Sequence, residues 1–254
     1  DRGTVFYSKL FEEFVAPEFS ASLVISLGDE RTLTALGRLD DKIVVFEENE
    51  IHVIYGEGPD NTGSGGDFAI HHVTSDVGCI DRKSVVETPR GLVFLSSRGF
   101  HLLDRGLNVT YISGAVEDMA ENIVVDAATL VHTEGEVRWG VRQVANFTAQ
   151  QETGPDNSLD LLVDGIIRPP RPKFANVLPT DAALVWNYEK NAWSVFSNYA
   201  GNASIMYQNR YTRLRSDWSV WQESLDRWDD PSGTNSMHLI TGHIKIGNMQ
   251  DFAR

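Results

Sequence analysis

The chain has 254 residues and a mass of 28.3 kDa, enough for one large domain or two small ones with a full hydrophobic core. Hydrophobic residues make up 41% and charged residues 23%, which is ordinary globular usage and excludes a disordered tail or a fibrous repeat. The 22 basic and 36 acidic residues give a net charge of −14, which disfavours proteins that read DNA sequences.

The ends of the sequence, its apolar runs and its cysteine content indicate the cellular compartment of the chain. Residues 1–15 mix charged with apolar side chains and form no signal peptide, and no apolar run reaches the roughly 18 residues of a membrane span. The single cysteine, Cys79, cannot close a disulfide within the chain and fits a reducing compartment. The chain begins with Asp1, and its last residues begin like a strand without an evident partner. We therefore expect a processed or partial chain with no membrane insertion.

Alternation of apolar and polar residues, rich in Val, Ile, Phe, Tyr and Trp, dominates the chain and predicts an all-β fold. Four segments each offer about four short strands joined by tight turns. They lie near residues 32–75, 83–113, 128–199 and 203–246. We expect a β-propeller or partial propeller of four-stranded antiparallel blades, in a single domain over residues 1–254.

The spacing of the turns supports a repeat of blades. The turn between the first and second strands falls near Asp40, Arg90, Gly135 and Arg210, at intervals of about 50, 45 and 75 residues. Removing about 35 inserted residues from the last interval leaves about 40, a length typical of a four-stranded blade.

Residue types at the turns and one short helical segment complete the pattern. Four residues suit tight reversals, because they tolerate left-handed backbone: Asn49, Gly99, Gly135 and Asn191. Four others share one face of a helical turn: Val116, Met119, Ala120 and Ile123. Ser113 is placed to cap its start, and we expect the turn to pack over a blade edge.

Residues 145–179 differ in composition from the blades and interrupt the third one. The stretch QETGPDNS is typical of a loop, LDLLVDGII of a hairpin or strand pair, and RPPRPK of extended polyproline. An insertion of this length between two blade strands must leave the blades. It is either a surface loop or an inserted arm that contacts another subunit.

Two features invite a ligand. The glycine-rich loop at residues 56–67 lacks the Gly-Lys-Ser/Thr ending of a phosphate-binding loop, and its three acidic residues repel phosphate. His71 and His72 are adjacent, so on a strand they face opposite sides and do not share an ion. His238 and His243 flank a turn, but no third ligand is evident. We predict no cofactor and no metal.

The sequence identifies no catalytic residues. Glycosidase and sialidase propellers need a carboxylate pair lining a channel, and the chain has many acidic residues but no repeated Asp-box and no arginine triad. No Gly-x-Ser-x-Gly elbow is present, and Cys79 has no assignable base, so we expect a buried cysteine. We predict a protein that is not an enzyme. The alternative is a carbohydrate-binding or carbohydrate-degrading propeller that engages the host surface.

Three runs of residues carry a resemblance to a known family. They are RLDDKIVVFEENEIHVIYGEGPDNTGSGGD, SDVGCIDRKSVV and GLVFLSSRGFHLLDRGLNVTYISGAVED, and the match covers about a third of the chain. The run NYEKNAWSVFSNYA adds an aromatic blade ending. This pattern resembles phage virion proteins of the lower tail or head-to-tail hub, such as the nozzle or packaged-DNA-stabilising components of short-tailed phages.

The resemblance implies a non-catalytic structural subunit of a phage tail, located in the virion and assembled in the host cytoplasm. It implies a homo-oligomeric ring of roughly six copies around the DNA channel, in contact with other tail or connector proteins. DNA would pass without sequence-specific binding, along acidic side chains that face the channel. The residues that we expect to matter are structural: Trp186, Trp193 and Phe196 in blade cores, and Gly91, Gly99 and Gly106 at turns.

Overall fold

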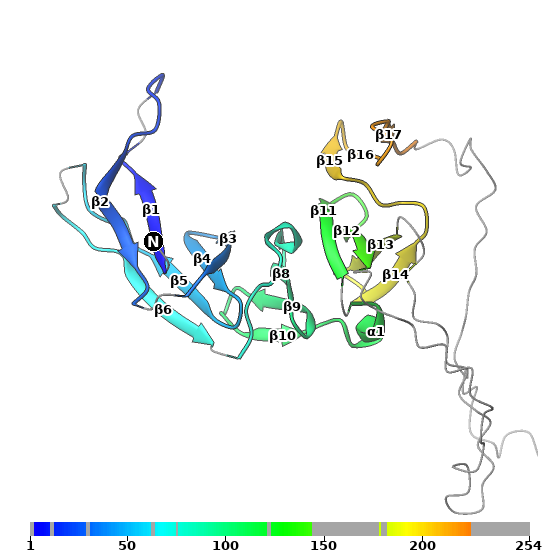
Figure 1. Cartoon of the computed structure of the whole chain (residues 1–254), viewed down its shortest axis with the longest axis horizontal. Helices are drawn as coiled ribbons and strands as arrows, with labels where there is room; N and C mark the ends of the chain where they lie inside the picture. Colours follow the sequence, from blue (N-terminus) through cyan, green and yellow to red (C-terminus); the bar gives the residue numbers. More distant parts are fainter. Residues whose placement is uncertain are drawn as a thin grey trace, which may run out of the picture. The chain divides into compact units, whose positions relative to one another are not determined.

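The computed structural model describes residues 3–10, 13–28, 31–61, 64–74, 76–120, 123–143, 178 and 182–224. These residues form an all-β fold, as the sequence predicts, with strands β1 to β17 and one four-residue helix, α1 (Glu117–Ala120) (Figure 1). The chain divides into two compact units, Asp1–Gln222 and Glu223–Arg254, and only the first two residues of the second unit are described. Strands β1 to β17 all lie in the first unit.

An antiparallel ribbon precedes the four segments in which the sequence predicts strands. It consists of two strands, β1 (Thr4–Ser8) and β2 (Phe19–Ser26). Ile25 of the ribbon packs with Val45 and Ile54 of the next sheet, and Val5 and Tyr7 lie against the same cluster. The ribbon therefore covers one face of the sheet that follows it.

Two four-stranded antiparallel sheets come next, and in each the consecutive strands pair in order. The first sheet contains β3 (Leu33–Leu39), β4 (Lys42–Glu47), β5 (Ile51–Tyr55) and β6 (Ala69–Thr74). The second sheet contains β7 (Val86–Thr88), β8 (Gly91–Ser96), β9 (Gly99–Asp104) and β10 (Val109–Tyr111). They occupy the first two segments that the alternating pattern marks out.

Two further sheets follow. The third sheet contains β11 (Ile123–Val131), β12 (Glu136–Gln143), β13 (Ala182–Asn187) and β14 (Ala192–Phe196). The fourth sheet contains β15 (Ala203–Tyr207), β16 (Arg210–Leu214) and β17 (Val220–Gln222). The expected arm at 145–179 falls between β12 and β13 and, apart from Leu178, lies outside the described residues, as does the last strand expected before residue 246.

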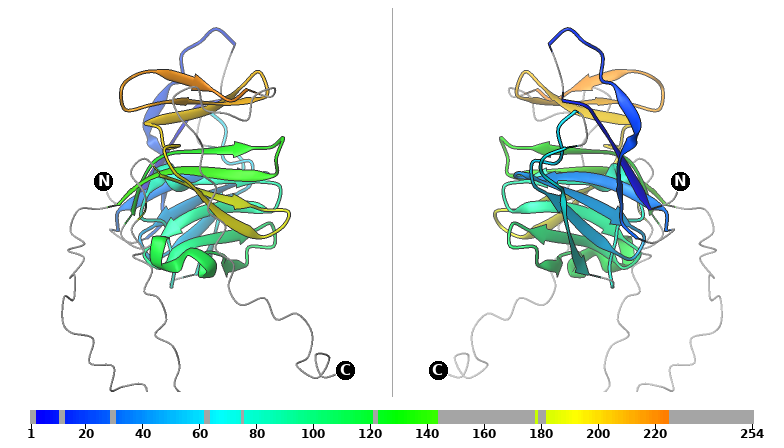
Figure 2. Two further views of the ribbon diagram at one scale, coloured as in Figure 1. Left: turned by 90° about the vertical axis from the view of Figure 1, so that its right-hand side faces the viewer. Right: turned by 90° about the vertical axis from the view of Figure 1, so that its left-hand side faces the viewer.

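The sheets pack face to face, which explains why their middle strands are buried on both sides. Val44 and Phe46 of β4 face the second sheet, where the Phe46 ring lies 4.9 Å from the ring of Phe94. Figure 2 shows the ribbons of the sheets from two opposite sides. On β8, Val93 and Leu95 face the opposite way, into the core shared with the third sheet. All six residues of β8 are buried, as expected for a strand between two apolar layers.

The first strands of successive sheets lie against one another. Strand β3 contacts β7, β7 contacts β11, and β11 contacts β15. Thr129 of β11 and Ser204 of β15 share a hydrogen bond of 2.6 Å between their hydroxyl oxygens. The four sheets thus approach one another along the edge that each forms with its first strand.

Most of the predicted turn residues adopt the expected backbone. Positive φ angles occur at four of them: Gly91, Gly99, Gly135 and Asn191. Gly106 lies in the turn between β9 and β10, but the positive φ of 64° falls on Leu107. At Gly99 a side chain would also meet the Ser113 hydroxyl, so both the backbone angle and the space require glycine.

Asn49 lies in the reversal between β4 and β5, as predicted, but it does not adopt a positive φ. The turn between β4 and β5 instead closes through a backbone hydrogen bond, in which Glu47 N donates to Glu50 O at 2.9 Å. Cys79 N donates to Glu47 O at 2.8 Å, so a neighbouring segment also holds the turn. The reversal therefore needs no left-handed residue at this position.

The helical segment forms, but its start differs from the prediction. It consists of a 3₁₀ turn, η2 (Gly114–Val116), followed by α1. Val116 and Ala120 are buried and Met119 is partly buried against the same core, as the helical periodicity predicts. Ser113 does not cap the segment with its side chain, because its Oγ accepts a hydrogen bond from Phe100 N at 2.9 Å.

The three aromatic residues expected in blade cores all lie in the third sheet. Trp186 is fully buried, and Trp193 is half-buried, with their ring centroids 6.3 Å apart. Trp193 Nε1 donates to the carbonyl of Ile112 at 2.8 Å, which ties the third sheet to the end of the second. Phe196 is half-buried and makes an edge contact with Tyr199.

Candidate functional site

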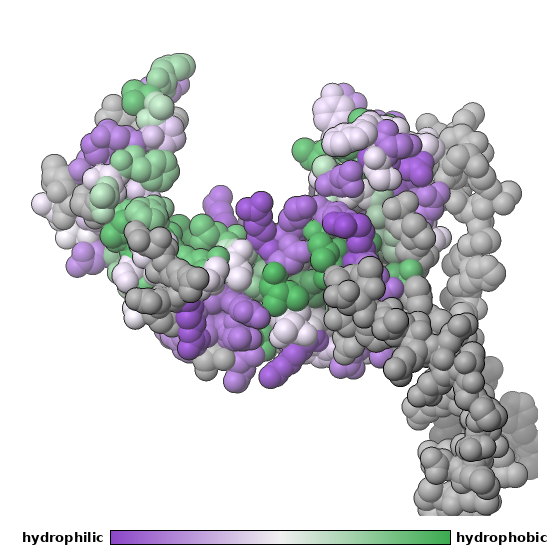
Figure 3. All heavy atoms as spheres, in the orientation of Figure 1, coloured by the Kyte–Doolittle hydropathy of each residue, from purple (hydrophilic) through white to green (hydrophobic). Residues whose placement is uncertain are grey.

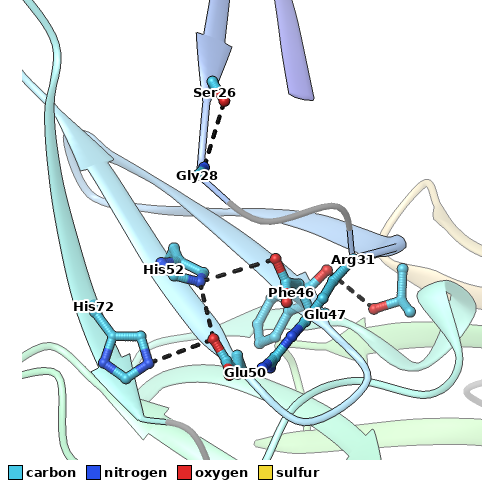
Figure 4. Close-up of polar contacts among 9 residues, drawn as sticks. Ser26, Gly28, Arg31, Phe46, Glu47, Glu50, His52 and His72 are labelled. Atoms are coloured by element: carbon cyan, nitrogen blue, oxygen red, sulfur yellow. Dashed lines mark hydrogen bonds and ion pairs between the residues drawn. The ribbon is translucent and has the colours of Figure 1, made fainter. Parts of the chain in front are cut away.

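A cluster of acidic and histidine side chains lies at the turn between β4 and β5 of the first sheet. Glu47 ends β4, Glu50 lies in the turn, His52 lies in β5 and His72 lies in β6. Figure 4 shows these four side chains, which we call the histidine–glutamate cluster, converging beside Arg31. It joins residues up to 25 positions apart in the chain, counting from 47 to 72.

Strand register brings the two histidines together. His52 and His72 are direct cross-strand partners, and their ring centroids lie 5.1 Å apart. Nearer the turn, Ile51 pairs with Thr74, so one extra residue of β6, Val73, is accommodated in a bulge between the two pairs. Cross-strand partners project from the same face, which places both imidazoles on the side of the sheet that the ribbon covers.

The polar atoms of the cluster lie close to one another. His52 Nε2 is 3.5 Å from Glu50 Oε2 and 3.9 Å from Glu47 Oε1. His72 Nε2 is 3.7 Å from the same Glu50 oxygen. The other Glu50 oxygen pairs with the Arg31 guanidinium, so a single carboxylate connects one cation and two imidazoles.

The cluster is largely shielded from water. Glu47 is 1%, His52 6% and Glu50 9% exposed, whereas the His72 side chain is 48% exposed. Buried carboxylates carry a large desolvation cost unless cations or donors pair with them. A cation bound beside these carboxylates would offset part of that cost.

Among the described residues, Glu50, His52 and His72 form a group that could hold a metal ion, with one ligand atom of each within 4.8 Å of the others. Two imidazoles and a carboxylate are a donor set that suits zinc and similar transition metals. This group was not predicted, because its histidines lie on two strands and its carboxylate in a turn, 22 positions apart between residues 50 and 72. The available signal was a histidine in each of two strands expected to pair, at residues 50–57 and 68–76.

The other histidine predictions have different outcomes. His71 pairs across the sheet with Val53, so His71 and His72 do face opposite sides, as predicted. His238 and His243 lie outside the described residues. The expectation that no metal binds therefore stays a prediction. His72 lies next to Glu50 and His52, two partners that the sequence did not suggest.

The glycine-rich loop at residues 56–67 folds back on itself. Pro59 and Gly65 form an isolated antiparallel bridge, and Asp60 N donates to Ser64 O at 2.7 Å. The Asp60 carboxylate accepts from Ser64 N at 3.0 Å. The Asp60 carboxylate thus accepts from a backbone amide that would be needed to bind phosphate. This fits the expectation that the loop is a connection between strands.

The cysteine-containing motif lies where three sheets meet. Cys79 N donates to the last carbonyl of β4 at 2.8 Å, and Ile80 N donates to the carbonyl of Leu95 in β8 at 2.9 Å. Asp81 Oδ2 accepts from the amide of Val125 in β11 at 2.9 Å. Three consecutive residues therefore bind the first, second and third sheets in turn. We call residues 79–84 the junction segment.

Ser84 closes the junction segment with three further hydrogen bonds. Its hydroxyl donates to Asp81 O at 2.6 Å and accepts from Leu95 N at 2.8 Å. Its carbonyl accepts from Trp139 Nε1 at 2.9 Å. The polar atoms of the motif thus make hydrogen bonds to backbone groups of neighbouring sheets.

Cys79 is fully buried, as the sequence predicts, and burial raises the pKa of its thiol from 9.0 to about 11. The neutral thiol therefore dominates at physiological pH, and the thiolate is the reactive form. At pH 8 we expect a thiol reagent such as iodoacetamide to label the native protein at least about 100-fold more slowly than the unfolded chain. Rapid labelling of the native protein, measured by mass spectrometry, would contradict this burial.

Comparison with protein-family models and with curated proteins assigns no function to the chain. No protein-family model matches the chain, and no curated protein gives a significant match. Within the described residues, no helix is long and apolar enough to span a membrane.

Proposed function

We propose that the chain is a non-catalytic structural subunit of a phage tail, and that its sheets are blades of a β-propeller or of part of one. The observation that carries the proposal is the series of contacts from β3 to β7, β11 and β15. In a propeller, neighbouring blades face one another and their innermost strands surround a common axis. Consecutive sheets with packed faces and adjoining first strands fit this arrangement.

The junction segment supports a structural role. It belongs to the run SDVGCIDRKSVV, one of the three runs that resemble phage tail hub and nozzle proteins. Its residues hold three successive sheets through hydrogen bonds to backbone groups, and its cysteine is buried with a raised pKa. The most distinctive motif of the resemblance thus connects blades, which favours a scaffold over an enzyme.

Charge and exposed apolar surface fit a ring of subunits around DNA. A net charge of −14 per copy disfavours adhesion to phosphate, so DNA can slide through such a ring. The N-terminal ribbon and the segment joining its strands expose five large apolar side chains: Phe6, Leu10, Phe14, Val15 and Phe19. Figure 3 shows hydrophobic residues in green at the surface of this part of the molecule. Apolar surface of this kind is typical of contacts with other chains.

The test is the assembly state of the purified 254-residue chain. We expect native mass spectrometry to give a closed oligomer of roughly six copies, and electron microscopy to show a ring with a central opening. We also expect no release of sugars from capsular polysaccharide and no retention of duplex DNA at physiological salt. A chain that stays monomeric at high concentration, or that hydrolyses glycans, would contradict the proposal and favour the carbohydrate-active alternative.

A further inference from the structure

We propose that Glu50, His52 and His72 bind a divalent transition-metal ion of the zinc type at the first sheet. One ligand atom from each residue lies within 4.8 Å of the other two. The proposal is independent of the phage-tail function, because it rests only on the geometry and chemistry of this cluster.

The donor set selects the class of metal. Imidazole nitrogens are good ligands for zinc, copper, nickel and iron, whereas calcium and magnesium require mainly oxygen ligands. A site with two histidines and one glutamate matches the three-ligand zinc sites that leave a fourth position for water. His72 is the half-exposed member, so the ion would be accessible to solvent from its side.

The distances are those of ligands arranged around one ion. Zinc bonds of about 2.0–2.2 Å place neighbouring ligand atoms of a tetrahedron about 3.3–3.6 Å apart. The separations from Glu50 Oε2 are 3.5 Å to His52 Nε2 and 3.7 Å to His72 Nε2. A small rotation of the half-exposed His72 side chain brings the third separation into the same range.

His52 supplies an independent reason to place an ion here. Its side chain is 8% exposed, and its Nε2 has no hydrogen-bond partner among the described residues. This nitrogen nevertheless points between two carboxylates, at 3.5 Å from Glu50 and 3.9 Å from Glu47 (Figure 4). A buried polar atom without a partner is costly, and a metal ion bonded to Nε2 removes that cost.

Arg31 and Glu47 fit the surroundings of a metal site. Arg31 pairs with the Glu50 oxygen that faces away from the histidines, which fixes the orientation of the ligating carboxylate. Glu47 adds a second buried negative charge beside His52. Carboxylates beside the ligands attract a divalent cation.

The ion would join strands that are neighbours in the sheet. Glu50 lies in the turn just before β5, His52 lies at the start of β5, and His72 lies in β6, the edge strand of the first sheet. A ligand that binds only the folded chain raises its stability by mass action. We therefore expect zinc to raise the melting temperature of the protein and to tie β6 to the sheet.

The experiment uses the full chain without an added histidine tag, stripped with a chelator and titrated with zinc chloride in a calorimeter. We expect one zinc ion per chain at this site, with a dissociation constant of about 1 μM or tighter. Cobalt(II) in place of zinc should give the visible absorption of a four-coordinate ion. His72→Gln should weaken zinc binding at least about 100-fold, and Arg31→Gln by about 10-fold.

The control is His71→Gln, which removes the neighbouring histidine on the opposite face of β6 and should bind zinc like the unmodified chain. Circular dichroism of each variant shows whether it is folded, and the half-exposed His72 makes loss of folding avoidable. The proposal is overturned if the unmodified chain takes up no zinc at about 100 μM, or if His72→Gln binds it with unchanged affinity. Equal losses from His71→Gln and His72→Gln would also overturn it.

Discussion

Replacing Trp139 with alanine is expected to lower the free energy of unfolding by about 3–5 kcal/mol, the range for truncating a buried tryptophan. Trp139 is fully buried in β12, with its ring 4.5 Å from Phe100 and 5.7 Å from Trp193. Its Nε1 donates to Ser84 O, so alanine also leaves a buried carbonyl without its donor. The substitution removes packing between the second and third sheets together with one connection to the junction segment.

The measurement is guanidinium denaturation followed by far-ultraviolet circular dichroism, because six tryptophans complicate fluorescence. Trp139→Phe keeps an aromatic ring but loses the N–H donor, so it should cost less than Trp139→Ala. Trp218→Ala is the control: its residue is 76% exposed, and we expect a change within about 0.5 kcal/mol. A loss below about 1 kcal/mol in Trp139→Ala would show that this residue does not belong to the core.

The strands of the four sheets could be predicted because each carries its own signal. In EVRWGVRQ, for example, Val137, Trp139 and Val141 alternate with other residues, and the structure buries all three in the core shared with the second sheet. The alternation of residues shows which side chains share a face of the strand. It does not show which neighbouring sheet packs against that face. The charged Arg138 on the opposite face is equally buried, which no composition rule predicts.

The histidine–glutamate cluster could not be predicted, because it depends on register. Residues 56–68 separate β5 from β6, and a loop of that length does not fix which residues pair. The extra residue Val73 then shifts the pairing within β6. Without that bulge, the pair that Ile51 forms with Thr74 would continue with His52 opposite Val73. One residue of register therefore decides whether His72 reaches the cluster.

The N-terminal ribbon was not predicted for a related reason. Strands β1 and β2 pair through a long connection, without a tight Gly- or Asn-containing turn between them. Ser8 pairs with Phe19 after a register irregularity, so the alternation on the two strands does not align continuously. The burial of Ile25 against the first sheet then comes from tertiary packing, which local sequence does not encode.

Replacing Arg138 with methionine is the second substitution with a large expected effect, a loss of about 3–5 kcal/mol in the free energy of unfolding. Arg138 is 2% exposed, pairs with Glu134 at 2.7 Å and Glu136 at 3.1 Å, and donates to Tyr199 OH at 3.0 Å. Its guanidinium also lies 5.0 Å from the ring centre of Tyr211 in β16. Methionine fills similar space but leaves the carboxylate of Glu136 and the Tyr199 hydroxyl without their cation.

Arg142 provides a matched control on the same strand. Its side chain is 66% exposed and pairs with Asp126, so Arg142→Met should cost at most about 1 kcal/mol, as surface ion pairs do. Adding Glu136→Gln to Arg138→Met should restore part of the loss, because it removes the carboxylate left without a cation.

Arg138 and Trp139 are adjacent, yet their contacts lie on opposite faces of β12. Arg138 reaches Tyr211 of the fourth sheet, and Trp139 reaches Phe100 of the second. If the third sheet packs independently on its two neighbours, the losses from Arg138→Met and Trp139→Ala should add to within about 0.5 kcal/mol in the double variant, provided that it still unfolds in one transition. If the double variant instead loses much less unfolding free energy than the sum of the two single losses, both side chains act on one shared core. In that case the first substitution already disrupts the packing on both faces of the third sheet.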